Sequence, residues 1–184
     1  MPLVTRDIAL TEEEYISFEL QSDIRHEFVN GKLIDMPGES DLHNDIVSNI
    51  LIALKTILKQ KGYNVYMESV KIKVPQEAKY YYPDIFVTKE KTGIKEYIKH
   101  QPELIVEVLS ESTRKYDTVD KFINYQKFPS LQYYILVEPD TTLVQLFYRE
   151  GEDWEMRSFT KISDVLQFDA LNISLSLKEI YGEE

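Results

Sequence analysis

The sequence contains no cysteine, so it offers no disulfide framework, no thiolate metal site and no cysteine nucleophile. It also lacks any run of about eighteen consecutive apolar residues, which argues against a membrane-spanning helix. The first residues show no basic segment followed by an apolar one, so no secretory signal is expected. Together these absences predict a soluble cytoplasmic protein whose chemistry rests on other side chains.

Positive charge is scarce, because 21 Lys and Arg stand against 32 Asp and Glu and the formal net charge is -11. Nucleic-acid binding depends largely on neutralising phosphates, so this balance argues against a generic nucleic-acid-binding surface. It leaves room for an enzyme that meets nucleic acid through a local basic patch and a bound cation. The 184 residues, of which 43% are hydrophobic, fit one packed domain spanning residues 1–184.

Two helices are predicted in the first third of the chain. Thr11 and Glu14 form a capping box that starts a short helix ending near Leu20. A longer helix is predicted over residues 41–61, because apolar residues recur there at three- and four-residue spacing and create one broad apolar face.

A β-hairpin is predicted over residues 24–36, between these helices. The Asn30-Gly31 dipeptide separates two strand-like runs, and this pair suits the positive φ angles of a type I′ turn. The hairpin pattern by itself favours a solvent-facing position for its carboxylates, Glu27 and Asp35.

The rest of the chain predicts further strands and one more main helix. Residues 89–101 are polar and are interpreted as a surface excursion, and residues 112–117 as a loop. From residue 165 onward, a loop, a short strand and a terminal helical turn over 177–181 are expected. The other predicted elements are strands over 63–74 (broken near 68–69), 80–87, 103–109, 131–137, 142–148 and 154–160, and a helix over 118–127. This order predicts a mixed α/β fold with a central sheet between the long helix and the second one.

Two of these apolar strands each carry a carboxylate, Asp84 in one and Glu107 in the other. An ionised carboxylate among apolar neighbours is costly unless something compensates it, and two on neighbouring strands would repel each other. A shared cation is the simplest compensation, and oxygen ligands suit Mg²⁺ first and Mn²⁺ second. The alternative is structural: Glu107 at a sheet edge with its head in water, and Asp84 capping a strand end.

The order of elements, with one acid on the second strand and another on the third, resembles the PD-(D/E)xK nuclease superfamily. Six further pieces of the chain are informative in this order: His26-Glu27-Phe28-Val29-Asn30-Gly31-Lys32-Leu33, the helix with His43, Tyr82-Pro83-Asp84-Ile85, Ile105-Val106-Glu107-Val108-Leu109-Ser110, Tyr116-Asp117 with Lys121 and Tyr125, and Tyr133-Tyr134-Ile135-Leu136-Val137. With these pieces the chain more closely resembles the Uma-type restriction endonuclease family, which has a restriction-endonuclease-like fold.

One position departs from the superfamily pattern. The motif lysine should stand two residues after the second acid, but that position is Leu109, on the same strand face as Glu107. In related nucleases this lysine migrates to the following helix, and Lys121 is the candidate here. Lys115 is a poorer choice, because it falls in the predicted loop.

The resemblance implies a metal-dependent endonuclease that hydrolyses phosphodiester bonds, with Mg²⁺ or Mn²⁺ as cofactor. Its implied metal ligands are Asp84, Glu107 and the backbone carbonyl of Val108, and Lys121 would stabilise developing charge or orient water. Glu27 matches the superfamily's upstream acid.

The same resemblance implies that His43 contacts phosphate or supports a ligand. The implied substrate is nucleic acid, with DNA favoured, and the implied assembly is a homodimer. Two alternatives stay open: a nuclease-fold module that binds nucleic acid or a partner protein without cutting, and a hydrolase of another phosphate ester.

Overall fold

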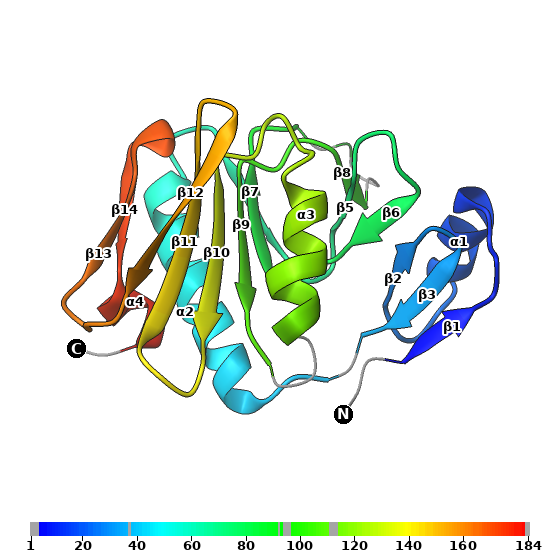
Figure 1. Ribbon diagram of the computed structural model, residues 1–184, viewed down its shortest axis with the longest axis horizontal. Coiled ribbons are helices and arrows are strands. Elements are labelled where there is room, and N and C mark those ends of the chain that lie inside the picture. Colours follow the sequence, from blue (N-terminus) through cyan, green and yellow to red (C-terminus); the bar gives the residue numbers. More distant parts are fainter. Residues whose placement is uncertain (1–3, 37, 92, 94–96, 111–113, 183–184) are drawn as a thin grey trace.

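The computed structural model describes residues 4–36, 38–91, 93, 97–110 and 114–182. Within them, the central sheet has six strands in the order β12-β11-β10-β9-β7-β4 (Figure 1). Strand β9 runs parallel to β10 and antiparallel to β7. The strands, in that spatial order, are β12 (Asp153–Phe159), β11 (Leu143–Glu150), β10 (Tyr133–Glu138), β9 (Leu104–Val108), β7 (Ile85–Thr88) and β4 (Asn64–Met67).

The long helix α2 (Asp41–Leu58) covers one face of this sheet, and the opposite face carries a helical segment made of η1 (Tyr116–Lys121) and α3 (Phe122–Tyr125). The apolar stripe of α2 packs with alternate residues of the central strands, such as Leu54 with the cluster around Val106. The predicted sandwich of helix, sheet and helix is confirmed.

A second six-stranded sheet stands beside the first, in the order β1-β3-β2-β6-β5-β8. Its hairpin pairs β2 with β3, and Asn30 and Gly31 have the positive φ angles that the turn was predicted to need. Two of its strands were not predicted: β1, and β8 inside the supposed surface excursion. The strands are β1 (Thr5–Asp7), β3 (Lys32–Asp35), β2 (His26–Val29), β6 (Lys79–Tyr81), β5 (Lys71–Lys73) and β8 (Ile98–Lys99).

The predicted strand over 80–87 is wrong as a single element, because it divides into β6 and β7, which belong to different sheets. Pro83 at the junction has no N–H for a strand ladder, and the N–H of Tyr82 donates to a side chain instead. The chain therefore crosses from one sheet to the other at Tyr82-Pro83-Asp84. The break predicted near 68–69 is confirmed, since β4 and β5 also lie in different sheets.

The remaining elements include one further correction. Residues 114–117 were predicted as part of a loop, but they are helical: the helical segment starts at residue 114 and continues into η1, which is a π-helix. Ser112 and Thr113, the first two residues of the predicted loop, lie outside the described residues. Near the end of the chain, β13 (Val165–Phe168) pairs with β14 (Ile173–Ser176), joined by a short 3₁₀ helix. The described chain also has α1 (Glu12–Glu19), with the predicted capping box, and α4 (Leu177–Tyr181). Its helices are too short or too polar to cross a membrane.

Candidate active site

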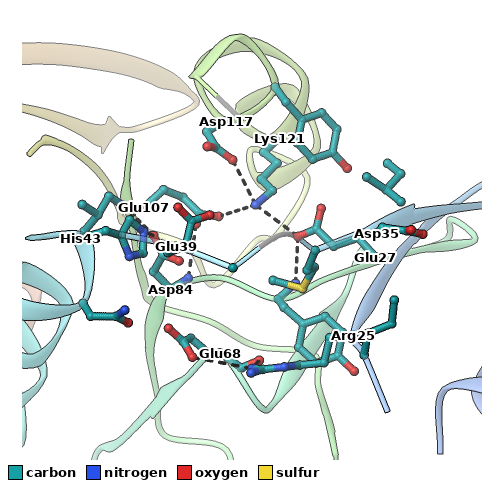
Figure 2. A pocket seen from close by; sticks show the side chains of 18 of the residues that line it. Arg25, Glu27, Asp35, Glu39, His43, Glu68, Asp84, Glu107, Asp117 and Lys121 are labelled. Atoms are coloured by element: carbon teal, nitrogen blue, oxygen red, sulfur yellow. Dashed lines mark hydrogen bonds and ion pairs between the residues drawn. The ribbon is translucent and has the colours of Figure 1, made fainter. Parts of the chain in front are cut away.

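A cavity of about 320 Å³ lies where the two sheets meet, and both sheets contribute to its walls. Acidic side chains outnumber basic ones in the lining, whose basic or titratable nitrogen groups are Arg25, Lys121 and His43 (Figure 2). The acidic lining residues are Asp23, Glu27, Asp35, Glu39, Glu68, Asp84, Glu107 and Asp117.

The carboxylates of Asp84 and Glu107 approach each other through the backbone of the paired strands. The N–H of Val108 donates to Asp84 Oδ2 at 2.7 Å, and the N–H of Asp84 donates to Glu107 Oε2 at 3.3 Å. The antiparallel pairing of β7 with β9 produces this exchange, because it brings the start of β7 beside the end of β9. The side chain of Asp84 keeps 15% of its surface exposed, whereas that of Glu107 keeps 3%. The structure thus brings the two predicted acids together at one cavity.

Lys121 reaches into this cavity from η1 and contacts three carboxylates. Its Nζ lies 3.2 Å from Glu107 Oε1, 3.1 Å from Glu27 Oε1 and 3.0 Å from Asp117 Oδ1 (Figure 2). Burial by itself lowers the pKa of a lysine, but these three carboxylates outweigh it and raise the pKa of Lys121 well above its ordinary value. The ammonium therefore stays charged at neutral pH. Lys115, the poorer candidate, is exposed on the same helical segment.

The hairpin pattern alone favoured a solvent-facing Glu27, and this prediction is wrong. The Glu27 side chain is only 3% exposed. Strand β2 lies inside the second sheet, between β3 and β6, so neither side of the hairpin is free. Glu27 Oε1 accepts the N–H of Tyr82 at 3.1 Å as well as the Lys121 contact. Burial raises the pKa of Glu27, and burial likewise raises the pKa of Glu107 well above its ordinary value.

His43 lies in the first turn of α2, where Ser40 Oγ caps the helix by accepting the His43 N–H. Its Nε2 lies 3.2 Å from Asp84 Oδ2, so it contacts a proposed ligand rather than open solvent. Burial lowers the pKa of His43, but the hydrogen bond and charge of Asp84 outweigh it, and the net pKa is raised.

Sequence reasoning gave no role to two residues that complete the cluster. Asp117 pairs with Lys121, and the Tyr125 hydroxyl donates to Glu107 Oε1 at 2.8 Å. Asp117, Lys121 and Tyr125 follow one another at four-residue spacing, which places them along one face of a helix. That spacing was a usable signal, but the mistaken loop over 112–117 concealed it.

The donor chemistry of the cavity fits a hard divalent cation. Carboxylate oxygens and a main-chain carbonyl are oxygen ligands of the kind Mg²⁺ takes, and Asp84 has the more exposed of the two paired carboxylates. Within the described ranges, no group of three or more His, Asp or Glu side chains is already arranged around a metal position. Glu27 and Glu107 instead share the ammonium of Lys121.

A mixed sheet between helices, with a Pro-Asp carboxylate and a second acid on the neighbouring strand, defines a restriction-endonuclease-like protein. The family described as "Uma2: Putative restriction endonuclease" matches residues 12–178, and the chain belongs to that family.

Known proteins resemble the chain over nearly its whole length. In Synechocystis sp. (strain ATCC 27184 / PCC 6803 / Kazusa), "Uncharacterized protein sll1609" is 27% identical, covering 94% of this chain and 100% of that protein. From the same organism, "Uncharacterized protein slr1290" is 30% identical, covering 94% and 91%. The crystal structure of "a putative nuclease belonging to DUF820" from Anabaena variabilis ATCC 29413 superposes with a TM-score of 0.77 at 18% identity. It covers 94% of this chain and 98% of its own, so the two proteins share a fold.

Proposed function

We propose that this protein is a Mg²⁺-dependent endonuclease that hydrolyses phosphodiester bonds in nucleic acid, with DNA as the favoured substrate and Mn²⁺ as a possible substitute ion. The observation that carries the proposal is the position of Lys121. Leu109 occupies the motif position for lysine, yet the Lys121 ammonium lies 3.2 Å from Glu107. A charged nitrogen thus stands beside the second acid although the motif position itself is apolar.

Asp84, Glu107 and the backbone carbonyl of Val108 would hold the ion. When bound, it supplies Lewis-acid stabilisation of the charge that develops on the phosphoryl oxygens. The acidic lining of the cavity supports this dependence, because a phosphodiester anion would be repelled from it unless a cation intervened.

The protein's own groups would position and stabilise the reacting phosphate. Lys121 remains protonated, so it acts as a hydrogen-bond donor and a fixed positive charge and not as a general base. Glu27 holds Lys121 from the other side and is available to orient a water or a second ion. His43 fixes the orientation of Asp84 through the contact from Nε2.

Cleavage of plasmid DNA, oligonucleotides and RNA in Mg²⁺, Mn²⁺ or EDTA tests the proposal. Asp84→Ala and the isosteric Asp84→Asn should abolish both divalent-ion binding and cleavage while the protein keeps its circular dichroism spectrum. Asp23→Asn is the matched control, because it removes the same charge from the lining of the same cavity. If Asp84→Ala retains full metal affinity, the metal site lies elsewhere.

A second candidate is a module of this fold that binds nucleic acid or a partner protein without cutting it. Leu109 at the motif position and the net charge of -11 favour it. Lys121 within hydrogen-bond reach of Glu107 favours the enzyme instead. Saturable binding with no cleavage in any of the three ion conditions would establish the module.

The assembly we propose is a homodimer, as the resemblance implies. The aromatic-rich strands β10 to β12 near the C-terminus are the proposed contact, and Met156 on the edge strand β12 is exposed there. Light scattering coupled to size exclusion measures the mass directly, and a monomer at the concentrations that support cleavage would refute the dimer.

A further inference from the structure

A second cavity, of about 460 Å³, shares no lining residue with the carboxylate cavity. Its lining is more apolar than polar, with Ile16 from α1 and Ile98 from β8 among the apolar side chains, and its lining residue Leu20 is one of the exposed large hydrophobic residues. The volume is in the range of sites that bind small molecules, about 300–1,000 Å³. Its lining residues are Ile16, Leu20, Lys71, Glu90, Tyr97, Ile98 and His100.

Lys71 is the unusual member of this lining, because only 3% of it is exposed. Its Nζ lies 4.9 Å from the ring centre of Tyr15 and 5.2 Å from that of Tyr82. Ring faces attract a cation but neutralise none of its charge. No ion pair joins this ammonium to a carboxylate in the part of the chain that the structure describes. Burial lowers the pKa of Lys71, and the charge of Glu19 offsets only part of that effect.

Among the described residues, Glu90 lines the cavity and Glu19 acts on Lys71 through its charge, and both carboxylates hydrogen-bond to other groups. Glu19 accepts hydrogen bonds from the N–H and the ring of His26 and from the Tyr82 hydroxyl. Glu90 lines the cavity, but its Oε2 accepts the backbone N–H groups of His100 and Gln101. Neither carboxylate forms an ion pair with Lys71 in the described chain, so its ammonium can donate a charge-assisted hydrogen bond to an anion from solution.

We propose that this cavity binds an amphipathic monoanion, with its carboxylate on the Lys71 ammonium and its apolar body against Ile16, Leu20 and Ile98. The charge selects the headgroup, because a buried cation gains most from a charge-assisted hydrogen bond. The apolar lining selects the body, because a small hydrated anion would leave that surface facing water. The proposal is independent of the proposed nuclease activity, since no catalytic residue lines this cavity.

Isothermal titration with decanoate and decanol, which share the same chain length and differ in headgroup charge, tests the proposal. The wild-type protein should bind decanoate about tenfold or more tightly than decanol, a ratio typical of one charge-assisted hydrogen bond. Lys71→Met should abolish that preference while decanol binding persists, which also shows that the cavity is still formed.

Lys73→Met is the matched control, because it removes an ammonium from the same strand at a residue that does not line the cavity. It should keep the preference for decanoate. Ile16→Trp, which adds bulk to the cavity lining and keeps Lys71, should weaken both ligands and serves if Lys71→Met fails to fold. Equal binding of the two ligands by the wild-type protein, or an unchanged preference in Lys71→Met, would overturn the proposal, as would no binding of either.

Discussion

The two faces of strand β9 differ in what they bury, although both are closed to solvent. One face places Val106 in an apolar cluster with the stripe of α2. The other places Glu107 beneath η1 and α3, within reach of Lys121 and Tyr125. Alternation along a single strand thus separates a face that only packs from a face that also carries charge.

The difference matters because the two faces stabilise the fold under different conditions. Apolar burial is nearly independent of pH, whereas a buried carboxyl group needs a cation beside it once it ionises. The α2 face should therefore supply stability that does not depend on pH, and the η1 face should set activity together with the part of the stability that changes with pH. The following experiments are designed to break or sharpen that contrast.

Lys121→Met should have the largest effect, because it leaves Glu27, Glu107 and Asp117 without their shared cation. We expect a loss of about 3–5 kcal/mol in the free energy of unfolding near neutral pH, together with loss of cleavage. The loss should shrink on acidification. A carboxyl group whose folded pKa is raised favours the folded state below its unfolded value of 4.5, and this contribution disappears as pH rises through the folded pKa.

Urea denaturation at about pH 5 and about pH 7.5 measures this effect. Lys115→Met is the matched control on the same helical segment, and as an exposed substitution it should change stability by less than about 0.5 kcal/mol. A Lys121→Met protein that is as stable as the wild type at neutral pH would show that the carboxylates are already protonated there.

Leu54→Ala on the opposite face should cost about 2–5 kcal/mol through the cavity it leaves, because Leu54 is fully buried. Unlike Lys121→Met, it should show the same loss at both pH values and leave the cleavage rate per folded molecule unchanged. Ile52→Ala, on the exposed side of the same helix, is the control. A pH-dependent loss in Leu54→Ala would mean that the two faces are coupled.

The sequence carried enough information to predict the apolar face almost completely. The three- and four-residue spacing over 41–61 identifies α2 and its stripe, because only a helix places such residues on one side. It also indicated the Asp84 and Glu107 pair, since a carboxylate in an apolar run is costly without compensation, although Glu107 lies inside β9 and Asp84 stands just before β7. Each of these signals is local, so the segment that carries it is enough to show it.

Residues whose position depends on a second sheet could not be predicted in the same way. Glu27 looks solvent-facing in an isolated hairpin, but groups from distant parts of the chain, the Tyr82 N–H and the Lys121 ammonium, cover its carboxylate. Strand β1 has only three residues, all exposed, so it gives no apolar pattern to detect. Asp117 lies in the π-helical turns of η1, although the sequence pattern around it is typical of a loop. Tertiary contacts, and not the local pattern, decide that this segment is helical.

Tyr125→Phe should have a smaller effect, because it removes one hydroxyl donor to Glu107 and leaves the ring in place. We expect a loss of about 1.5–3 kcal/mol in unfolding free energy, typical of a hydrogen bond to a charged group. Cleavage should fall as well, since Glu107 loses one of the groups that hold its ionised form. Tyr133→Phe is the control for cleavage, because the hydroxyl of Tyr133 accepts a backbone N–H far from the cavity. Unchanged cleavage in Tyr125→Phe would make that hydroxyl purely structural.

His43→Gln should have the smallest effect, and it should depend on pH. Because the folded pKa of His43 is raised above its ordinary 6.5, its contribution is fully present below about pH 6.5 and is lost as pH rises through the folded value. The wild-type protein should therefore lose about 1 kcal/mol more stability than the variant between about pH 6 and about pH 9. Denaturation curves with EDTA present isolate this difference, because Glu27 and Glu107 titrate in both proteins. Parallel pH profiles would mean that the contact with Asp84 does not depend on an imidazolium.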